Sequence, residues 1–236
     1  MNIEFFTREV KKLNQEIRDA FHDRENNIHV ITDGPMDIAE YFSSTKKIMW
    51  LMKEPYEKDI REGDWSIPGL YTDDYRRFFS DLINGDSGRT WQPVVYSTYG
   101  ILNEFSLWDD IPFIRNEPDI VKILGKIAWV NIQKLPSENG SSTNMGHIYS
   151  AYGKYKELLS KQINLLDPDI IICGNTFSVI GNELGNPTKN IFTNNVEYYQ
   201  AGKRLYVNAY HPAQRKITRE VYVNDIVNCV KSKILK

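Results

Sequence analysis

Three apolar runs in this sequence end in side chains that could take part in acid–base chemistry or hydrogen bonding. The first run is followed by Glu54, the second ends in Asn131, and the third is followed by His211. A carboxylate can orient a water or stabilise a cation, and a histidine can donate to a developing negative charge. An asparagine carries both a donor and an acceptor, the pair needed to read the edge of an amide-like base. A proline follows both Glu54 and His211, and it stiffens the loop that holds each side chain.

Each of these residues also has a structural explanation. Glu54 fits an ordinary charged surface turn, Asn131 fits a side chain that bonds to nearby backbone, and a single histidine such as His211 is more often structural than catalytic. The shared position at strand ends favours chemistry, because open α/β sheets bind their ligands at the carboxyl ends of parallel strands.

Three further residues near these strand ends have more than one interpretation. Tyr56 could stack on a flat ligand or cap the core. Lys134 could contact a phosphate, but a solvated side chain is the favoured interpretation. Arg215 could contact a phosphate, act as a wedge in stacked DNA, or begin a charged helix, and the last of these is slightly favoured.

The elements that must position these side chains follow from the apolar pattern. Four short runs rich in β-branched or aromatic residues have the character of buried parallel strands. They span Lys47–Met52, Lys126–Ile132, Asp169–Gly174 and Arg204–Ala209. Tracts with helical spacing separate them, which indicates a βαβ sheet covered on both faces. Helices are expected at Ile3–Arg24, Tyr71–Leu82, Val94–Phe105, Ile148–Leu166 and Arg219–Ile234, and a short edge strand at His29–Thr32.

These elements predict an α/β protein, a three-layer αβα sandwich with a central four-stranded, mainly parallel sheet. No repeat, low-complexity tract or linker rich in Pro, Gly or Ser divides residues 1–236, so one domain is expected. Two long loops, Lys53–Gly69 and Gln133–His147, follow strands directly. They are therefore expected at the carboxyl edge of the sheet, with a functional role.

The composition, 41% hydrophobic and 25% charged residues, is that of a soluble globular protein. No apolar run approaches the ~20 residues that span a bilayer, and the N-terminus lacks a signal core, so a cytoplasmic protein with no membrane partner is expected. A net charge of −2 argues against a protein that coats nucleic acid by bulk electrostatics, but it is compatible with a local basic rim.

The sequence offers no support for a cofactor or a metal. Two cysteines, Cys173 and Cys229, are too few to ligate an iron–sulfur cluster, and buried, reduced thiols are expected. The four histidines lack metal-ligand spacing. Gly174 opens a tight turn whose following helix start would suit an anion, but the spacing matches neither a P-loop nor a dinucleotide fingerprint.

Taken in order, the three strand ends resemble the uracil-DNA glycosylase superfamily. The first motif of that family is Gly-Gln-Asp-Pro-Tyr or a variant, and Lys53-Glu54-Pro55-Tyr56 is similar to its last four residues. The second motif is an apolar strand that ends in Asn, here Ala128–Asn131. The third is His-Pro-Ser-Pro followed by Leu or Arg, and His211–Arg215 resembles the Arg-bearing form. Leu166–Gly174 is also similar to the entry to the family's third strand.

The resemblance implies a DNA glycosylase-like hydrolase that flips a uracil-type base and excises it by cleaving the N-glycosidic bond. Glu54 would position water or stabilise the sugar cation, and His211 would stabilise charge on the departing base oxygen. Asn131 would hydrogen-bond the flipped base, Tyr56 would shape the pocket beside it, and Arg215 would fill the space vacated in the DNA stack. No cofactor and no iron–sulfur cluster are implied.

The chain departs from the family pattern in three places. Met52 or Lys53, depending on the alignment, stands where the family motif has glycine, and Glu54, one methylene longer, stands where the family has aspartate. Ala213-Gln214 replaces the Ser-Pro half of the last motif. Two alternatives therefore stay open: a non-catalytic module that binds a nucleobase or nucleic acid on the same fold, and a hydrolase of small-molecule nucleosides. The expected partner is DNA, single- or double-stranded, or a free nucleobase.

Overall fold

A computed structural model describes residues 2–21, 28–56, 65–72, 77–80, 85, 87–137, 143–185 and 187–234. The labelled α-helices are α1 (Ile3–Phe21), α2 (Ile38–Ser43), α3 (Ile67–Thr72), α5 (Gly88–Leu102), α6 (Met145–Leu166), α7 (Phe177–Ile180) and α8 (Arg219–Ile234). The strands are β1 (Gly34–Pro35), β2 (Ile48–Met52), β3 (Ile127–Asn131), β4 (Ile170–Gly174), β5 (Asn190–Ile191), β6 (Glu197–Ala201) and β7 (Arg204–Ala209). Short 3-10 helices are η1 (Trp108–Asp110), η2 (Pro118–Lys126) and η3 (Gly181–Leu184).

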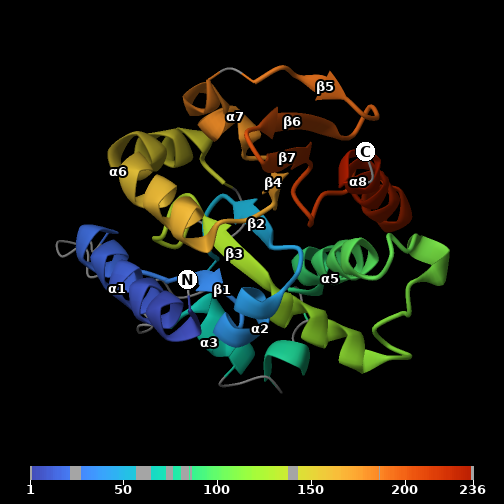
Figure 1. Cartoon of the computed structure of the whole chain (residues 1–236), viewed down its shortest axis with the longest axis horizontal. Coiled ribbons are helices and arrows are strands. Elements are labelled where there is room, and N and C mark those ends of the chain that lie inside the picture. The colour runs from blue at the N-terminus through green and yellow to red at the C-terminus, as the bar shows by residue number, and fades with distance from the viewer. Residues whose placement is uncertain are drawn as a thin grey trace.

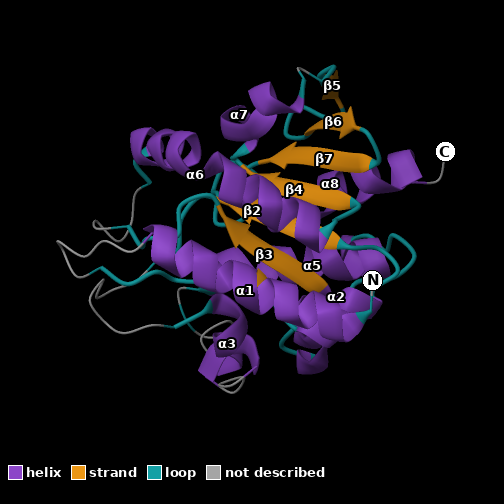
Figure 2. Cartoon of the chain, turned by 60° about the vertical axis from the view of Figure 1, so that its left-hand side comes forward, coloured by secondary structure: helices purple, strands orange, loops and turns teal. Residues whose placement is uncertain are grey.

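Within the described residues the sheet has seven strands, in the order β1-β3-β2-β4-β7-β6-β5. The central strands β3, β2, β4 and β7 run parallel to one another, and β1, β6 and β5 pair antiparallel at the two edges. The parallel strands are the four that the sequence predicts, with bounds that agree to within one residue. The predicted α/β fold is confirmed, although the sheet is larger than the predicted four strands. Figure 2 shows the arrowheads of the parallel strands at one edge of the sheet.

Helices cover both faces of the sheet, so the molecule has three layers (Figure 1). The helices α5 and α8 lie on one face, and α1, α6 and α7 lie on the other. Side chains alternate between the two faces along each strand. Trp50 and Trp129 therefore pack toward α5 and α8, whereas Leu51 and Val130 pack toward α1 and α6. The predicted layering is confirmed.

Helix bounds follow local capping and packing. In α1 the predicted apolar stripe is buried, and the expected extension to Arg24 falls outside the described residues. α6 begins after Asn144, whose side chain accepts from Gly146 N, and it ends at Asp167 in a left-handed conformation before a proline. α5 begins six residues before the predicted Val94, because Pro93 lies inside the helix and does not start it. Of the helix expected over residues 71–82, only 71–72 and 77–80 are described, and these are helical.

The predicted edge strand at His29–Thr32 is wrong in position and length. Ile31 N donates to Lys134 O, in the segment that follows β3, but the ladder pairing with β3 is limited to Gly34 and Pro35. A proline lacks the N–H that would extend such a ladder. Residues 57–64 and 138–142 of the two long loops fall outside the described residues. No helix of the described part is long and apolar enough to cross a membrane.

Candidate functional site

Glu54, Asn131 and His211, three of the predicted site residues, lie at or just after the carboxyl ends of the parallel strands, at one edge of the sheet. Met52 ends β2 directly beside Asn131 at the end of β3. On the other side of β2, Gly174 ends β4 in register with Ala209 of β7, and His211 follows two residues later. Because neighbouring strands lie about 4.8 Å apart, the ends of β3 and β7 are separated by about 14 Å. Asn131 and His211 therefore lie at the same edge of the sheet, with the ends of β2 and β4 between them.

The side chain of Asn131 is buried at this edge without a hydrogen-bond partner. Its residue is 1% exposed, yet neither Oδ1 nor Nδ2 of its side chain has a hydrogen-bond partner in the described structure. Its backbone N–H, by contrast, donates to Asp33 Oδ2 at 2.7 Å. Each buried polar group without a partner costs about 1–3 kcal/mol, and such groups in native proteins require an explanation. An amide with an unused donor and an unused acceptor suits a ligand that presents the complementary pair.

Glu54 is the second residue of this edge with an unpaired buried atom. Five buried side-chain polar atoms lack partners among the described residues, and three of them belong to Glu54 and Asn131. Burial raises the pKa of the Glu54 carboxyl, and a hydrogen bond from Thr143 and the charges of Lys53 and His147 oppose that rise. Glu54 Oε2 is the atom left free. A carboxylate with one free oxygen in a partly buried site can hold a water molecule or accept its proton.

His211 is held as a neutral imidazole with a defined tautomer. Burial, and then the charge of Lys53, lower the pKa of its side chain to about 4. Its Nδ1 accepts a hydrogen bond from Ala213 N at 3.2 Å, so the ring proton lies on Nε2. The Tyr222 hydroxyl donates to Tyr210 O at 2.9 Å, which fixes the backbone just before His211 to α8. The geometry leaves Nε2–H as a neutral donor at the strand end.

The loop after His211 is closed by Gln214. Its backbone N–H donates to His211 O at 2.9 Å. Its side chain accepts from Ile217 N and donates to Ile217 O, each at 3.0 Å. These hydrogen bonds hold residues 211–217 in a closed turn.

Met52 and Gly174 end β2 and β4, the two strands between Asn131 and His211. They form the floor of this edge. A Cβ placed on Gly174 would lie 2.6 Å from Met52 Sδ, 2.9 Å from Met52 Cε and 3.4 Å from Pro212 Cδ. The methionine side chain therefore lies sideways over β4, in space that only a glycine leaves open.

The turn after Gly174 is hydrogen-bonded to the strands on either side of β4. Asn175 adopts a left-handed conformation with φ of 61°, and its N–H donates to Ala209 O at 2.8 Å. The Thr176 hydroxyl donates to Leu51 O at 2.8 Å. The helix that follows, α7, is a single turn, so the anion site that the sequence suggests at its start has little helix behind it.

Three of the predicted residues lie elsewhere than expected. Tyr56 is 59% exposed, so it does not enclose a pocket in this structure. The interpretation of Lys134 as solvated is wrong: the residue is 2% exposed, and its Nζ pairs with Asp33 and Gln162. Arg215 is exposed and lines a cavity of about 260 Å³ together with Arg89.

Sequence reasoning missed several residues that build this edge. Thr143 and His147 act on Glu54 from the end of the Gln133–His147 loop, which the sequence does place at this edge. Asp33 carries no local signal, because its partners Asn131 and Lys134 are about a hundred residues away in the chain. Only the folded sheet brings them together.

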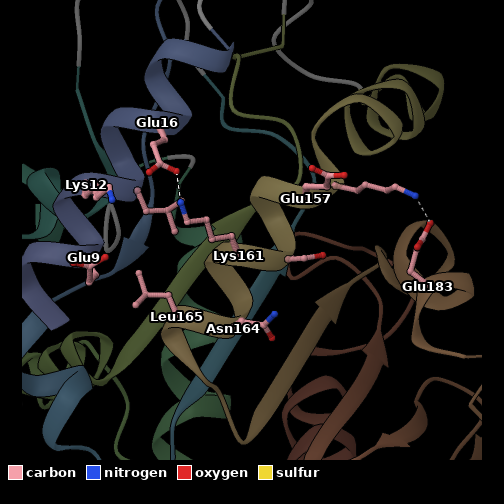
Figure 3. A pocket seen from close by; sticks show the side chains of 11 residues that line it. Glu9, Lys12, Glu16, Glu157, Lys161, Asn164, Leu165 and Glu183 are labelled. Carbon is pink, nitrogen blue, oxygen red and sulfur yellow. Dashed lines mark hydrogen bonds and ion pairs between the residues drawn. The ribbon is translucent and has the colours of Figure 1, made fainter. Parts of the chain in front are cut away.

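A cavity lies away from this edge. It measures about 660 Å³ and lies between α1 and the second half of α6 (Figure 3). Two ion pairs join charged residues of its lining: Lys161 pairs with Glu16, and Lys156 pairs with Glu183. None of the unpaired buried atoms of the described residues belongs to its lining. This cavity therefore lacks the unpaired buried groups that mark the edge with Glu54 and Asn131.

The described residues contain no group of three or more His, Cys, Asp or Glu side chains that could hold a metal ion. Cys173 and Cys229 are both buried and free, and burial raises the pKa of each thiol to about 12. A thiol with so high a pKa carries little thiolate at neutral pH, so neither cysteine suits nucleophilic catalysis.

No protein-family model matches the sequence, and no curated protein matches it either.

Proposed function

We propose that the chain is a DNA glycosylase-like hydrolase that binds a uracil-type base and cleaves its N-glycosidic bond. The base would bind at the strand-end site, by which we mean Glu54, Asn131 and His211 with Met52 and Gly174 between them. The observation that carries this proposal is the buried, unpaired amide of Asn131. A uracil edge presents an N–H donor beside a carbonyl acceptor, and Asn131 Oδ1 and Nδ2 can satisfy both. Such an edge is free only when the base has left the stack, which is how enzymes that act on a base gain access to it.

The chemistry requires two further groups, because cleavage separates charge. The bond between C1′ and the base nitrogen breaks, the electron pair leaves with the base, and positive charge develops on the sugar. The Nε2–H of neutral His211 would donate to the base oxygen that gains negative charge. Glu54, when ionised, would stabilise the sugar cation and orient the water that adds to C1′, accepting its proton. The departing base is then protonated from solvent.

A non-catalytic module that binds a nucleobase is the second candidate. The observation that favours it is the place of Met52, whose side chain occupies the floor of the site where the family motif has glycine. A base that rests higher above this floor would still reach Asn131, but it would lie farther from Glu54. Binding without cleavage is the outcome that this arrangement predicts.

The test is an assay of base release from uracil-containing single- and double-stranded DNA, extended to other modified bases and to free nucleosides. We expect the wild-type chain to release uracil from DNA, and the variants Glu54→Gln and His211→Gln to lose most of that activity. Glu157→Gln, an exposed carboxyl of the groove between α1 and α6, is the matched control. Failure to release any base contradicts the glycosylase proposal, and saturable base binding in the same samples would then select the binding module. Release from nucleosides but not from DNA would select a small-molecule hydrolase.

A further inference from the structure

Three arginines surround the cavity beside the His211 loop. The cavity measures about 260 Å³, and its charged lining consists of Arg89, Arg215 and Arg219. All three residues are exposed, and no carboxylate of the described residues lines the cavity with them. In a chain with a net charge of −2, such a one-sided cluster is a local basic site.

The elements that hold these arginines add to the positive potential. Arg89 is the second residue of α5, and Arg219 is the first residue of α8, two helices that pack against each other. A helix N-terminus carries a partial positive charge and unpaired N–H groups. Arg215 lies in the loop after His211. The two hydrogen bonds between the Gln214 side chain and the Ile217 backbone hold that loop in shape.

The guanidinium groups retain free donors, whereas the other polar groups of the lining are engaged. Gln214 is bonded within its own loop, and the Tyr222 hydroxyl donates to Tyr210 O. Arg219 Nη1 donates to Gln92 Oε1. Because a guanidinium has five N–H donors, Arg219 keeps most of its capacity for a ligand. No ion pair among the described residues involves any of the three arginines, so each retains its charge for an anion.

The cavity adjoins the strand-end site. Pro212 lines it, and the same proline contacts the floor of the strand-end site beside Gly174. A nucleotide whose base entered beside His211 would therefore have its backbone near the arginines. Phosphate oxygens match the planar fork of an arginine, and several arginines around one phosphate are a common solution for binding it.

We infer that Arg89, Arg215 and Arg219 form a clamp for a backbone phosphate of single-stranded nucleic acid next to the base in the strand-end site. This inference rests on the proposed function for the place of the base. It changes the role of Arg215 from a wedge in the DNA stack to a phosphate ligand. It also adds two residues that no sequence motif indicates.

The experiment measures binding of an undamaged, fluorescently labelled single-stranded oligonucleotide by anisotropy over a series of KCl concentrations. The test variant is Arg89→Ala/Arg215→Ala/Arg219→Ala, and the control is Arg8→Ala/Lys11→Ala/Lys12→Ala on α1, where three exposed cations are also removed. We expect the Kd at low salt to be at least tenfold larger for the test variant only. The slope of log K against log salt should become shallower by about 0.7 for each phosphate that the variant no longer neutralises.

Equal Kd values for the test and control variants would overturn the inference. The single variant Arg215→Glu provides the same comparison if the triple variant does not fold. A second arm offers inorganic phosphate and a nucleoside monophosphate; binding of these to the wild type without any binding of the oligonucleotide also overturns it. Because the strand is undamaged, the result is separable from catalysis. Loss of binding in the test variant supports the clamp even if no base is released. Base release with unchanged oligonucleotide binding in the test variant contradicts the clamp and leaves the proposed function standing.

Discussion

The carboxylate of Asp33 joins a buried cation to the backbone of Asn131. Its Oδ2 accepts from Asn131 N at 2.7 Å, and its two oxygens accept from Lys134 Nζ at 2.7 and 2.9 Å. Gln162 Nε2 completes the cluster with a bond of 2.9 Å to Asp33 Oδ1. The side chain that would read a base therefore extends from a strand end that a buried ion pair holds in place.

Breaking this ion pair should destabilise the fold strongly. Lys134→Met leaves the charge of Asp33 buried without its cation, and removal of one partner of a buried pair costs about 3–5 kcal/mol. Urea unfolding measures the loss. Lys156→Met is the matched control, because its partner Glu183 is exposed and the pair is half in solvent. A Lys134→Met effect no larger than that of Lys156→Met would show that the pair contributes little.

Replacing Asn131 should have the opposite effect on stability. Asn131→Leu substitutes two methyl groups for the two unpaired polar groups in a similar shape, so the free energy of unfolding should stay equal or rise. Binding of the nucleobase should be lost at the same time. The control is Asn208→Leu in β7, which removes the bond from Nδ2 to Glu197 Oε2 and should cost about 1 kcal/mol. If Asn131→Leu destabilises the unliganded protein as much as Asn208→Leu, the amide has a structural partner.

The lowered pKa of His211 predicts a loss of stability in acid. The folded pKa of about 4 lies below the unfolded value of 6.5, so between these values the unfolded chain binds more protons. The contribution of His211 is therefore fully present above pH 6.5 and falls as the pH drops toward 4, by at most about 3 kcal/mol. Unfolding experiments from pH 4 to 7 on the wild type and His211→Gln measure it. Parallel stability curves for the two proteins would contradict the buried neutral imidazole.

The sequence predicts the centre of this fold better than its periphery. The four parallel strands are continuous apolar runs, because both of their faces are covered by helices, and such runs are visible in the sequence. The sequence does not indicate β6, because it is a partly exposed strand with polar residues, or β1, because it is a two-residue pairing that includes Pro35.

Some residues of the candidate site can be predicted from the sequence, and others depend on contacts that only the fold creates. Strand ends place Glu54, Asn131 and His211 at one edge from topology alone. The burial of Lys134 could not be predicted, because it depends on Asp33, a partner 101 positions earlier that only the fold brings near. The exposure of Tyr56 likewise depends on how its loop packs after the strand ends.

The raised pKa of Glu54 predicts the acidic limb of a pH profile. If Glu54 must be ionised to orient water, base release should fall as the pH drops through its pKa, which burial places above the usual value of a glutamate. Glu54→Gln should lower the rate by about 100- to 10,000-fold and remove the limb. The rate of base release between pH 4 and 8 measures both effects. An unchanged limb in Glu54→Gln would assign it to another group.

A substitution at Gly174 should block the strand-end site with the Met52 side chain. It leaves Glu54, Asn131 and His211 unchanged. In Gly174→Ala the new Cβ would lie 2.6 Å from Met52 Sδ, so the methionine must move. The end of a methionine side chain is flexible, and we expect a small change in stability. Since the displaced side chain cannot remain over β4, it should occupy space nearer Asn131 and weaken base binding at least tenfold.

A second substitution separates this displacement from general damage to the sheet. Met52→Ala should lower stability by about 2–5 kcal/mol, because it removes a buried methionine. In the double variant Gly174→Ala/Met52→Ala the side chain that blocks the site is gone, so base binding should return although the protein is less stable than the wild type. Calorimetric titration with the free base and urea unfolding give the two quantities for all four proteins. Binding that stays weak in the double variant would show that Gly174 acts through the backbone, and binding that is unaffected by Gly174→Ala would place the base away from Met52.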